Sequence, residues 1–165
     1  MKRVLSLLAS ITLALAASQS AGAQDLTKLS LDDSASIGLR LRTDTAVKVE
    51  GAASLRIDTL WPTSVCLGEV TGVDAEAVRL LFRARVRTEL EGDAFLEMWV
   101  HVGGGQYFSR GMNDPVRGKS DWKSIQTPFT LLKGQKPDKV TLNVVINGKG
   151  TVWVDDVVLS KAPLK

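Results

Sequence analysis

Histidine, cysteine and tyrosine each occur only once in this chain of 165 residues. The single cysteine, Cys66, excludes a disulfide within the chain, and its apolar neighbours Val65 and Leu67 predict a buried, unreactive thiol. One histidine and one cysteine are too few for a zinc site. His101 has no sequence neighbour that identifies a nucleophile, so a Ser-His-Asp triad or a small hydrolase with paired carboxylates is the least favoured interpretation.

Long apolar runs are also lacking, except at the N-terminus. There an apolar run follows Lys2 and Arg3 and ends in the small residues Ala21-Gly22-Ala23. This layout predicts a cleavable signal peptide at residues 1–23, one domain at residues 24–165, and a secreted or periplasmic location. The run is shorter than the ~20 residues of a membrane span. Its removal leaves 19 basic against 18 acidic residues, so a net charge of only +1 disfavours a nucleic-acid partner.

The remaining sequence is dominated by alternation of apolar and polar residues, which is the pattern of half-buried strands. Turn-forming residues separate the alternating segments, as in Glu91-Gly92-Asp93 and Gly103-Gly104-Gly105. The pattern predicts an all-β fold, a β-sandwich of about eight antiparallel strands. The predicted strands cover residues 37–41, 55–59, 65–70, 78–88, 95–102, 124–131, 140–146 and 151–159.

Residues 78–90 fit two patterns, because apolar residues recur there at every fourth position, as in a helix, and at every second position, as in a strand. The strand is favoured because it separates an apolar face from a face that carries four arginines, Arg79, Arg83, Arg85 and Arg87. That row of arginines predicts a solvated sheet surface. The less favoured alternative is a cradle for an acidic glycan or a lipid headgroup.

Adjacent carboxylates interrupt the last alternating segment, Val152-Trp153-Val154-Asp155-Asp156-Val157. A carboxylate within a buried strand needs hydrogen bonds or a cation, which predicts a structural or ligand site at this end of the sheet. Together with Glu50-Gly51 before Ser54-Leu55, and with Gly118 before Asp121-Trp122, the segment resembles galactose-binding-like, carbohydrate-binding-module-like jelly rolls over roughly residues 32–160.

The resemblance implies a jelly-roll β-sandwich that binds a ligand without transforming it. It also implies a structural calcium site that links the first strand to the last. The implied ligands are Asp155, then Asp32 or Asp33 from the N-terminal side, and a backbone carbonyl near Gly51. The alternative is that the aspartate pairs cap turns and face solvent.

Residues 95–102 predict a binding surface. Alternation places Leu96, Met98, Val100 and Val102 on one face and leaves Glu97, Trp99 and His101 on the other. An aromatic ring flanked by a carboxylate and an imidazole suits a sugar ring, which has apolar faces and equatorial hydroxyl groups. The alternative is that Trp99 fills the core of the sandwich.

Further contacts are predicted outside that segment. Tyr107 and Arg110 follow the triple glycine and are expected at the rim of the site, and Trp61 is expected on an exposed loop. The sequence therefore predicts a non-catalytic binding domain for a carbohydrate or a glycan-bearing surface. The alternative is a protein-interaction adaptor of the cell envelope, in which Trp99 and Tyr107 would contact a partner chain.

Overall fold

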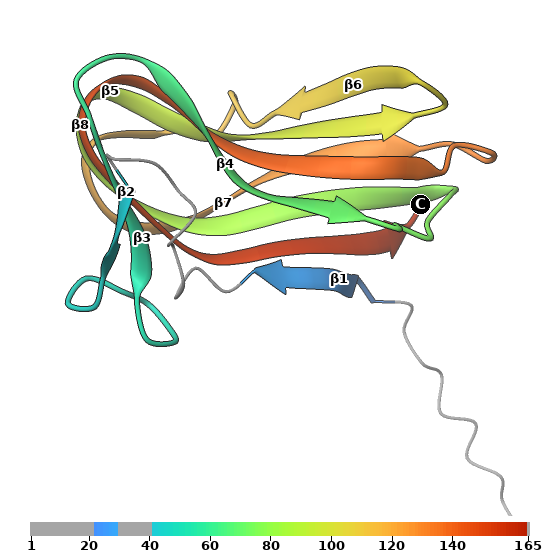
Figure 1. Ribbon diagram of the computed structural model, residues 1–165, viewed down its shortest axis with the longest axis horizontal. Coiled ribbons are helices and arrows are strands. Elements are labelled where there is room, and N and C mark those ends of the chain that lie inside the picture. The colour runs from blue at the N-terminus through green and yellow to red at the C-terminus, as the bar shows by residue number, and fades with distance from the viewer. Residues whose placement is uncertain (1–21, 30–40, 165) are drawn as a thin grey trace, which may run out of the picture.

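The computed structural model describes residues 22–29 and 41–164, and all regular structure in that part of the chain is β-strand (Figure 1). No helix capable of crossing a membrane occurs among these described residues. The predicted strand at residues 37–41 lies outside them except for Leu41, which begins β2. The prediction of an all-β fold with eight antiparallel strands is confirmed. In chain order the strands are β1 (Gln24–Leu29), β2 (Leu41–Asp44), β3 (Ser54–Thr59), β4 (Thr63–Thr71), β5 (Val78–Val102), β6 (Gly105–Arg110), β7 (Val116–Leu131) and β8 (Pro137–Pro163).

β5 and β8 pair along almost their whole length and run through both layers of the fold. In the first layer, called sheet 1, β4 pairs with residues 139–146 of β8, and β6 pairs with residues 97–102 of β5. In the second layer, called sheet 2, β7 pairs mainly with the first part of β5, while β3 and β1 pair with the last part of β8 and β2 pairs with β3. The two layers stack as a β-sandwich (Figure 1).

Glycines make the bend by which β5 and β8 pass from one sheet to the other. Gly92 in β5 and Gly148 and Gly150 in β8 have φ angles of 139°, 146° and 134°. A Cβ atom on Gly92 would lie 1.9 Å from the backbone oxygen of Asn147, and one on Gly148 would lie 2.0 Å from that of Glu91. The bend therefore needs glycine both for its backbone conformation and for the close approach of the two strands.

The hydrophobic core lies between the two sheets, and β5 contributes to both sides of it. Leu96 and Met98 point inward from sheet 1, and Leu80 and Phe82 point inward from sheet 2; none of the four has exposed surface. Residues 78–90 thus form a strand with its apolar face buried, as predicted.

Two pairs of predicted strands are continuous in the structure. Residues 78–88 and 95–102 both belong to β5, and residues 140–146 and 151–159 both belong to β8. The turn-forming residues between them bend the chain without ending the pairing. β1 and β6 are absent from the predicted strands because short segments of mixed polarity show no clear alternation.

The prediction of a buried Cys66 is wrong. Cys66 is exposed, whereas its neighbour Leu67 is buried. β4 has a bulge between Cys66 and Gly68, and Cys66 lies opposite Asn143 on the outer face of sheet 1. Adjacent residues of a half-buried strand point to opposite faces, so the apolar neighbours of Cys66 were no guide to the burial of its thiol.

Candidate ligand-binding face

The outer face of sheet 1 carries the predicted binding residues of β5 together with their partners on β6. The antiparallel register places Glu97 opposite Arg110, and Trp99 opposite Phe108. Directly opposed residues point to the same side of a sheet, so an aromatic pair lies beside a charged pair. Trp99 is therefore outside the core between the sheets. This outer face of β5 and β6 is called the Trp99 face below.

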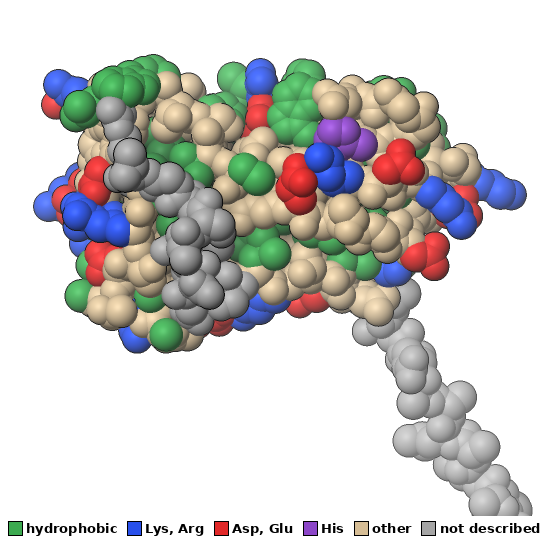
Figure 2. Space-filling model, in the orientation of Figure 1, with side chains coloured by type: hydrophobic (Ala, Val, Ile, Leu, Met, Phe, Trp, Pro, Cys, Tyr) green, Lys and Arg blue, Asp and Glu red, His purple; other side chains and the backbone are tan. Residues whose placement is uncertain are grey.

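Trp99 and Phe108 form the aromatic centre of the Trp99 face. Their ring centroids are 5.2 Å apart, and the ring planes are inclined by 47°. Trp99 is half-buried and Phe108 is 53% exposed. Hydrophobic side chains are visible at the molecular surface among charged groups in Figure 2. Aromatic rings that remain partly open to solvent can stack on the apolar face of a sugar or on a partner side chain.

Glu97 lies beside this aromatic pair, on the same face of β5, and is only 4% exposed. Its Oε1 accepts hydrogen bonds from Nε1 of Trp99 at 2.7 Å and from Nδ2 of Asn143 at 3.3 Å, and its Oε2 accepts one from Nε of Arg110 at 2.5 Å. Burial raises the pKa of Glu97, but the hydrogen bonds from Arg110, Trp99 and Asn143 outweigh it and hold the pKa below its ordinary value. The ionised carboxylate thus fixes both the indole and the guanidinium.

Arg110 contacts both Phe108 and Glu97 at the surface of the Trp99 face. Its guanidinium lies over the ring of Phe108, 4.8 Å from the centroid, while its Nε is bound to Glu97. The side chain remains 43% exposed. Arg110 is therefore held in place at the surface of the Trp99 face by two separate contacts.

Polar side chains, among them His101, lie on the other side of Trp99. Nδ1 of His101 lies 3.3 Å from Nε2 of Gln106, its partner on β6. On the β8 side, Lys139 donates a hydrogen bond to Glu69 at 2.8 Å, and the hydroxyl of Thr141 donates to the same carboxylate oxygen at 3.1 Å. The hydrogen bond from Lys139, followed by that from Thr141, lowers the pKa of Glu69.

Two predicted contacts do not join this group. Tyr107 lies opposite Val100, on the other side of β6, although half of its surface is exposed. Trp61 is exposed on the β3–β4 connection, and the register puts this connection near Ala94, roughly 16 Å along β5 from Trp99. Phe108 takes the position expected of Tyr107. The sequence shows that Phe108 shares the outer face with Trp99 only once the pairing of β5 with β6 is known.

Asp155 anchors the β2–β3 connection to β8. Its Oδ2 accepts hydrogen bonds from the backbone amides of Val49 at 2.7 Å and Glu50 at 3.2 Å, and its Oδ1 accepts one from the amide of Asp156 at 2.7 Å. Lys28 of β1 forms ion pairs with Glu50 and, at 3.4 Å, with Asp156. These hydrogen bonds compensate the free-energy cost of burying the carboxylate of Asp155.

The calcium site stays a prediction. Within residues 22–29 and 41–164, no group of three or more histidine, cysteine, aspartate or glutamate side chains is arranged to hold a metal ion. Asp32 and Asp33 lie outside the described residues. Gly51 lies in the connection that Asp155 anchors, with a φ of 60°.

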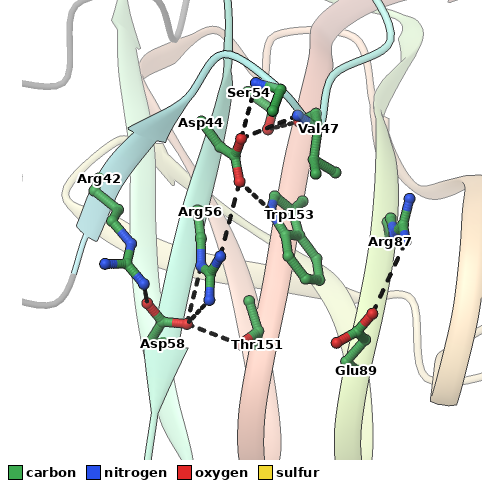
Figure 3. A network of polar contacts seen from close by, with 11 residues as sticks. Arg42, Asp44, Val47, Ser54, Arg56, Asp58, Arg87, Glu89, Thr151 and Trp153 are labelled. Carbon is green, nitrogen blue, oxygen red and sulfur yellow. Dashed lines mark hydrogen bonds and ion pairs between the residues drawn. The ribbon is translucent and has the colours of Figure 1, made fainter.

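A second polar cluster covers part of the outer face of sheet 2 (Figure 3). Its centre is Trp153, which is 4% exposed and donates its indole N–H to Oδ2 of Asp44 at 2.9 Å. The guanidinium groups of Arg56 and Arg87 lie over the indole, 5.2 and 5.4 Å from the ring centroid. The predicted solvated row of arginines is thus partly packed, since Arg87 covers a tryptophan.

A hollow of about 700 Å³ lies at the bend between the sheets. Among the described residues no aromatic side chain lines it, and most of its charged groups have partners: Glu91 pairs with Lys149 at 3.1 Å, and Asp58 pairs with Arg42 at 2.5 Å. The Trp99 face combines open aromatic rings with hydrogen-bonding groups, so it is the stronger candidate for a ligand site.

No family model matches the sequence, and no curated protein is similar to it in sequence. Solved structures share its fold. A family 16 carbohydrate-binding module matches with a TM-score of 0.53 and 9% identity, covering 74% of this chain and 86% of the module. A xylan-binding family 22 module from Paenibacillus barcinonensis matches with a TM-score of 0.51 and 11% identity, covering 87% of this chain and 94% of the module.

The same fold occurs within a larger protein. The enzymatically active domain of tailspike protein 4 from bacteriophage CBA120 matches with a TM-score of 0.55 and 6% identity, over 72% of this chain but only 17% of that one. At such identities the similarity concerns the fold alone. The protein has the jelly-roll fold of carbohydrate-binding modules, as the resemblance predicted.

Proposed function

We propose that this protein is a non-catalytic carbohydrate-binding domain and that the Trp99 face holds the sugar. The observation that carries the proposal is the pair Trp99 and Phe108, partly open to solvent, with the indole N–H bound by the buried carboxylate of Glu97. A rigid aromatic surface loses little conformational entropy when a sugar ring stacks on it. The carbohydrate-binding modules that share the fold are consistent with this role.

A binding role is favoured over hydrolysis by the state of Glu97. The general acid of a glycosidase needs a raised pKa so that it carries a proton at neutral pH. The pKa of Glu97 is lowered, because the bonds from Arg110, Trp99 and Asn143 outweigh its burial. Its oxygens also accept hydrogen bonds from three side chains, so Glu97 is suited to positioning its neighbours and not to the role of a general acid.

Two further features of the prediction belong to this proposal. The protein is secreted or periplasmic, and β1 begins at Gln24, immediately after the predicted cleavage site.

Calcium, if bound, is structural and completes its ligand set with Asp32 or Asp33 beside Asp155. Added calcium should then raise the melting temperature, because it binds only the folded ligand set, and Asp155→Ala should abolish the increase. An unchanged melting temperature with calcium and with chelator would contradict this part.

The central experiment is a glycan screen with the purified protein, followed by affinity measurements on Trp99→Ala. Loss of an aromatic anchor costs about 2 kcal/mol, roughly thirtyfold in affinity. Leu132→Ala is a suitable control, because Leu132 is an exposed residue after the end of β7. Unchanged affinity of Trp99→Ala would exclude the Trp99 face as the binding site.

Binding to another envelope protein is the second candidate. Tyr107, Phe108 and Met112 are all at least half exposed and lie on or just after β6, at the edge of sheet 1. Exposed aromatic and methionine side chains are typical of protein interfaces. If no glycan binds in the screen and Tyr107→Ala reduces recovery of a specific envelope protein, this candidate replaces the first.

A further inference from the structure

We propose that the sugar chain bound on the Trp99 face carries carboxylate groups, as uronic acids do, and that Arg110 recognises them. The inference rests on the proposed function and adds the chemical class of the ligand.

Arg110 presents one edge of its guanidinium to the protein and keeps another for a ligand. Its Nε donates to Glu97, and its plane lies over Phe108. Among the described residues, no hydrogen bond from its two terminal nitrogens is present, and the side chain is 43% exposed. A guanidinium offers parallel N–H groups that match the two oxygens of a carboxylate. Because Arg110 is already fixed, it loses little freedom when it binds.

Each acidic residue of this face is already paired with a cation, Glu97 with Arg110 and Glu69 with Lys139. Glu97 is ionised, but it is 4% exposed and its oxygens accept hydrogen bonds from three side chains, so little of the carboxylate is open to a ligand. Glu69 is occupied by Lys139 and by Thr141. A uronic acid stacked on the aromatic pair would therefore meet the free edge of Arg110 and no unpaired carboxylate among the described residues of this face.

A purely structural role for Arg110 makes a different prediction. If Arg110 only neutralised Glu97, a lysine would supply the same charge, and the ligand would be indifferent to the substitution. Recognition of a carboxylate depends on the planar fork, which lysine lacks. Arg110→Lys therefore distinguishes the two roles while it keeps a positive charge beside the buried carboxylate.

The experiment compares two polymers that differ only in their carboxyl groups: a xylan bearing glucuronic acid, and the same xylan after chemical reduction of those carboxyl groups to alcohols. Titration calorimetry gives the affinity of the full protein for each. The acidic polymer should bind about tenfold more tightly or better, since hydrogen bonds between charged groups are the stronger class. Arg110→Lys should lose most of this preference, whereas Arg117→Lys, at an exposed arginine of β7, should keep it.

The outcomes separate the inference from the function on which it rests. Equal affinity for both polymers, with binding still abolished by Trp99→Ala, would overturn the acidic class and leave carbohydrate binding in place. A preference for the acidic polymer that survives Arg110→Lys would overturn the assignment to Arg110. Failure to bind these polymers and every neutral glycan would remove the proposed function itself. The comparison of polymers on the unmodified protein remains decisive even if Arg110→Lys unfolds.

Discussion

Two tryptophans with similar hydrogen bonds lie on the outer faces of the two sheets, and only one of them is open to solvent. Trp99 donates its indole N–H to Glu97 at 2.7 Å, and Trp153 donates its own to Asp44 at 2.9 Å. Arg56 and Arg87 lie over the ring of Trp153, whereas the ring beside Trp99 is that of Phe108. Trp153 is 4% exposed, whereas Trp99 is half-buried.

The neighbouring strands explain the difference. Trp153 lies between Arg56 of β3 and Arg87 of β5, and both long side chains fold over its ring. Trp99 has the small Thr141 on one side and Phe108 of the edge strand β6 on the other, and Phe108 packs beside the indole without covering it as the two arginines cover Trp153. A tryptophan on the outer face of a sheet thus becomes a structural residue when long side chains flank it, and stays available to a ligand when they do not.

The largest expected effect is the loss of stability in Trp153→Ala. Removing a buried tryptophan costs about 3–5 kcal/mol, and here it also leaves two arginines without their stacking partner. Urea unfolding measures the change. Trp99→Ala, the matched substitution on the other face, should lower stability clearly less. Equal losses in the two variants would contradict the distinction between a structural and an available tryptophan.

Asp155→Ala should follow, with a loss of roughly 2–3 kcal/mol, because hydrogen bonds to a charged group are among the stronger ones. Three backbone amides lose their acceptor in this variant, two of them in the β2–β3 connection. Hydrogen exchange should show faster exchange at Val49 and Glu50 than in the unmodified protein. Slow exchange at both amides would mean that Asp155 does not anchor the connection.

Substitution of each tryptophan by phenylalanine sharpens the comparison. Trp153→Phe should lower stability by about 1–3 kcal/mol, since an aromatic ring is kept but Asp44 loses one hydrogen bond and the smaller phenyl leaves part of the buried space empty. Trp99→Phe should change stability by a similar or smaller amount, because Arg110 and Asn143 still bind Glu97. It should also retain part of the affinity that Trp99→Ala loses. Complete loss of affinity in Trp99→Phe would point to the indole N–H, and not to stacking.

The smallest effect is expected in acid. The folded pKa of Glu97 lies below its ordinary value of 4.5, so its ionisation stabilises the fold above that pH, and this contribution is lost as the pH falls through the folded pKa. Protonation of Glu97 should also weaken ligand binding in the same range, since it releases Arg110 and Trp99. Glu97→Gln should flatten this part of the stability curve. If Glu97→Gln loses stability at low pH as the unmodified protein does, the loss belongs to other carboxylates. Asp44 is one of them, since the hydrogen bond from Trp153 and then that from the amide of Val47 lower its pKa.

Much of the candidate site was predictable from alternation within β5, which separates the outward Glu97 and Trp99 from the inward Met98. The role of Glu97 was not. The sequence indicates a carboxylate beside an aromatic residue on an exposed face, which suggests a direct contact with the ligand. In the structure, hydrogen bonds from residues 13 and 46 positions away occupy that carboxylate. A local sequence pattern cannot predict hydrogen-bond partners that are so distant along the chain.

The sequence by itself determined that the chain is a β-sandwich, because the alternation of apolar and polar residues specifies which side chains of each strand point into the core. It also supplied the glycines, Gly92 and Gly148, at which β5 and β8 bend. Only the tertiary structure decided which residues meet across strands: Phe108 beside Trp99, Arg110 on Glu97, and two arginines over Trp153. The reason is that a two-residue period defines the face on which a side chain lies, whereas its neighbour on that face depends on strand order and register, which arise from contacts between distant segments.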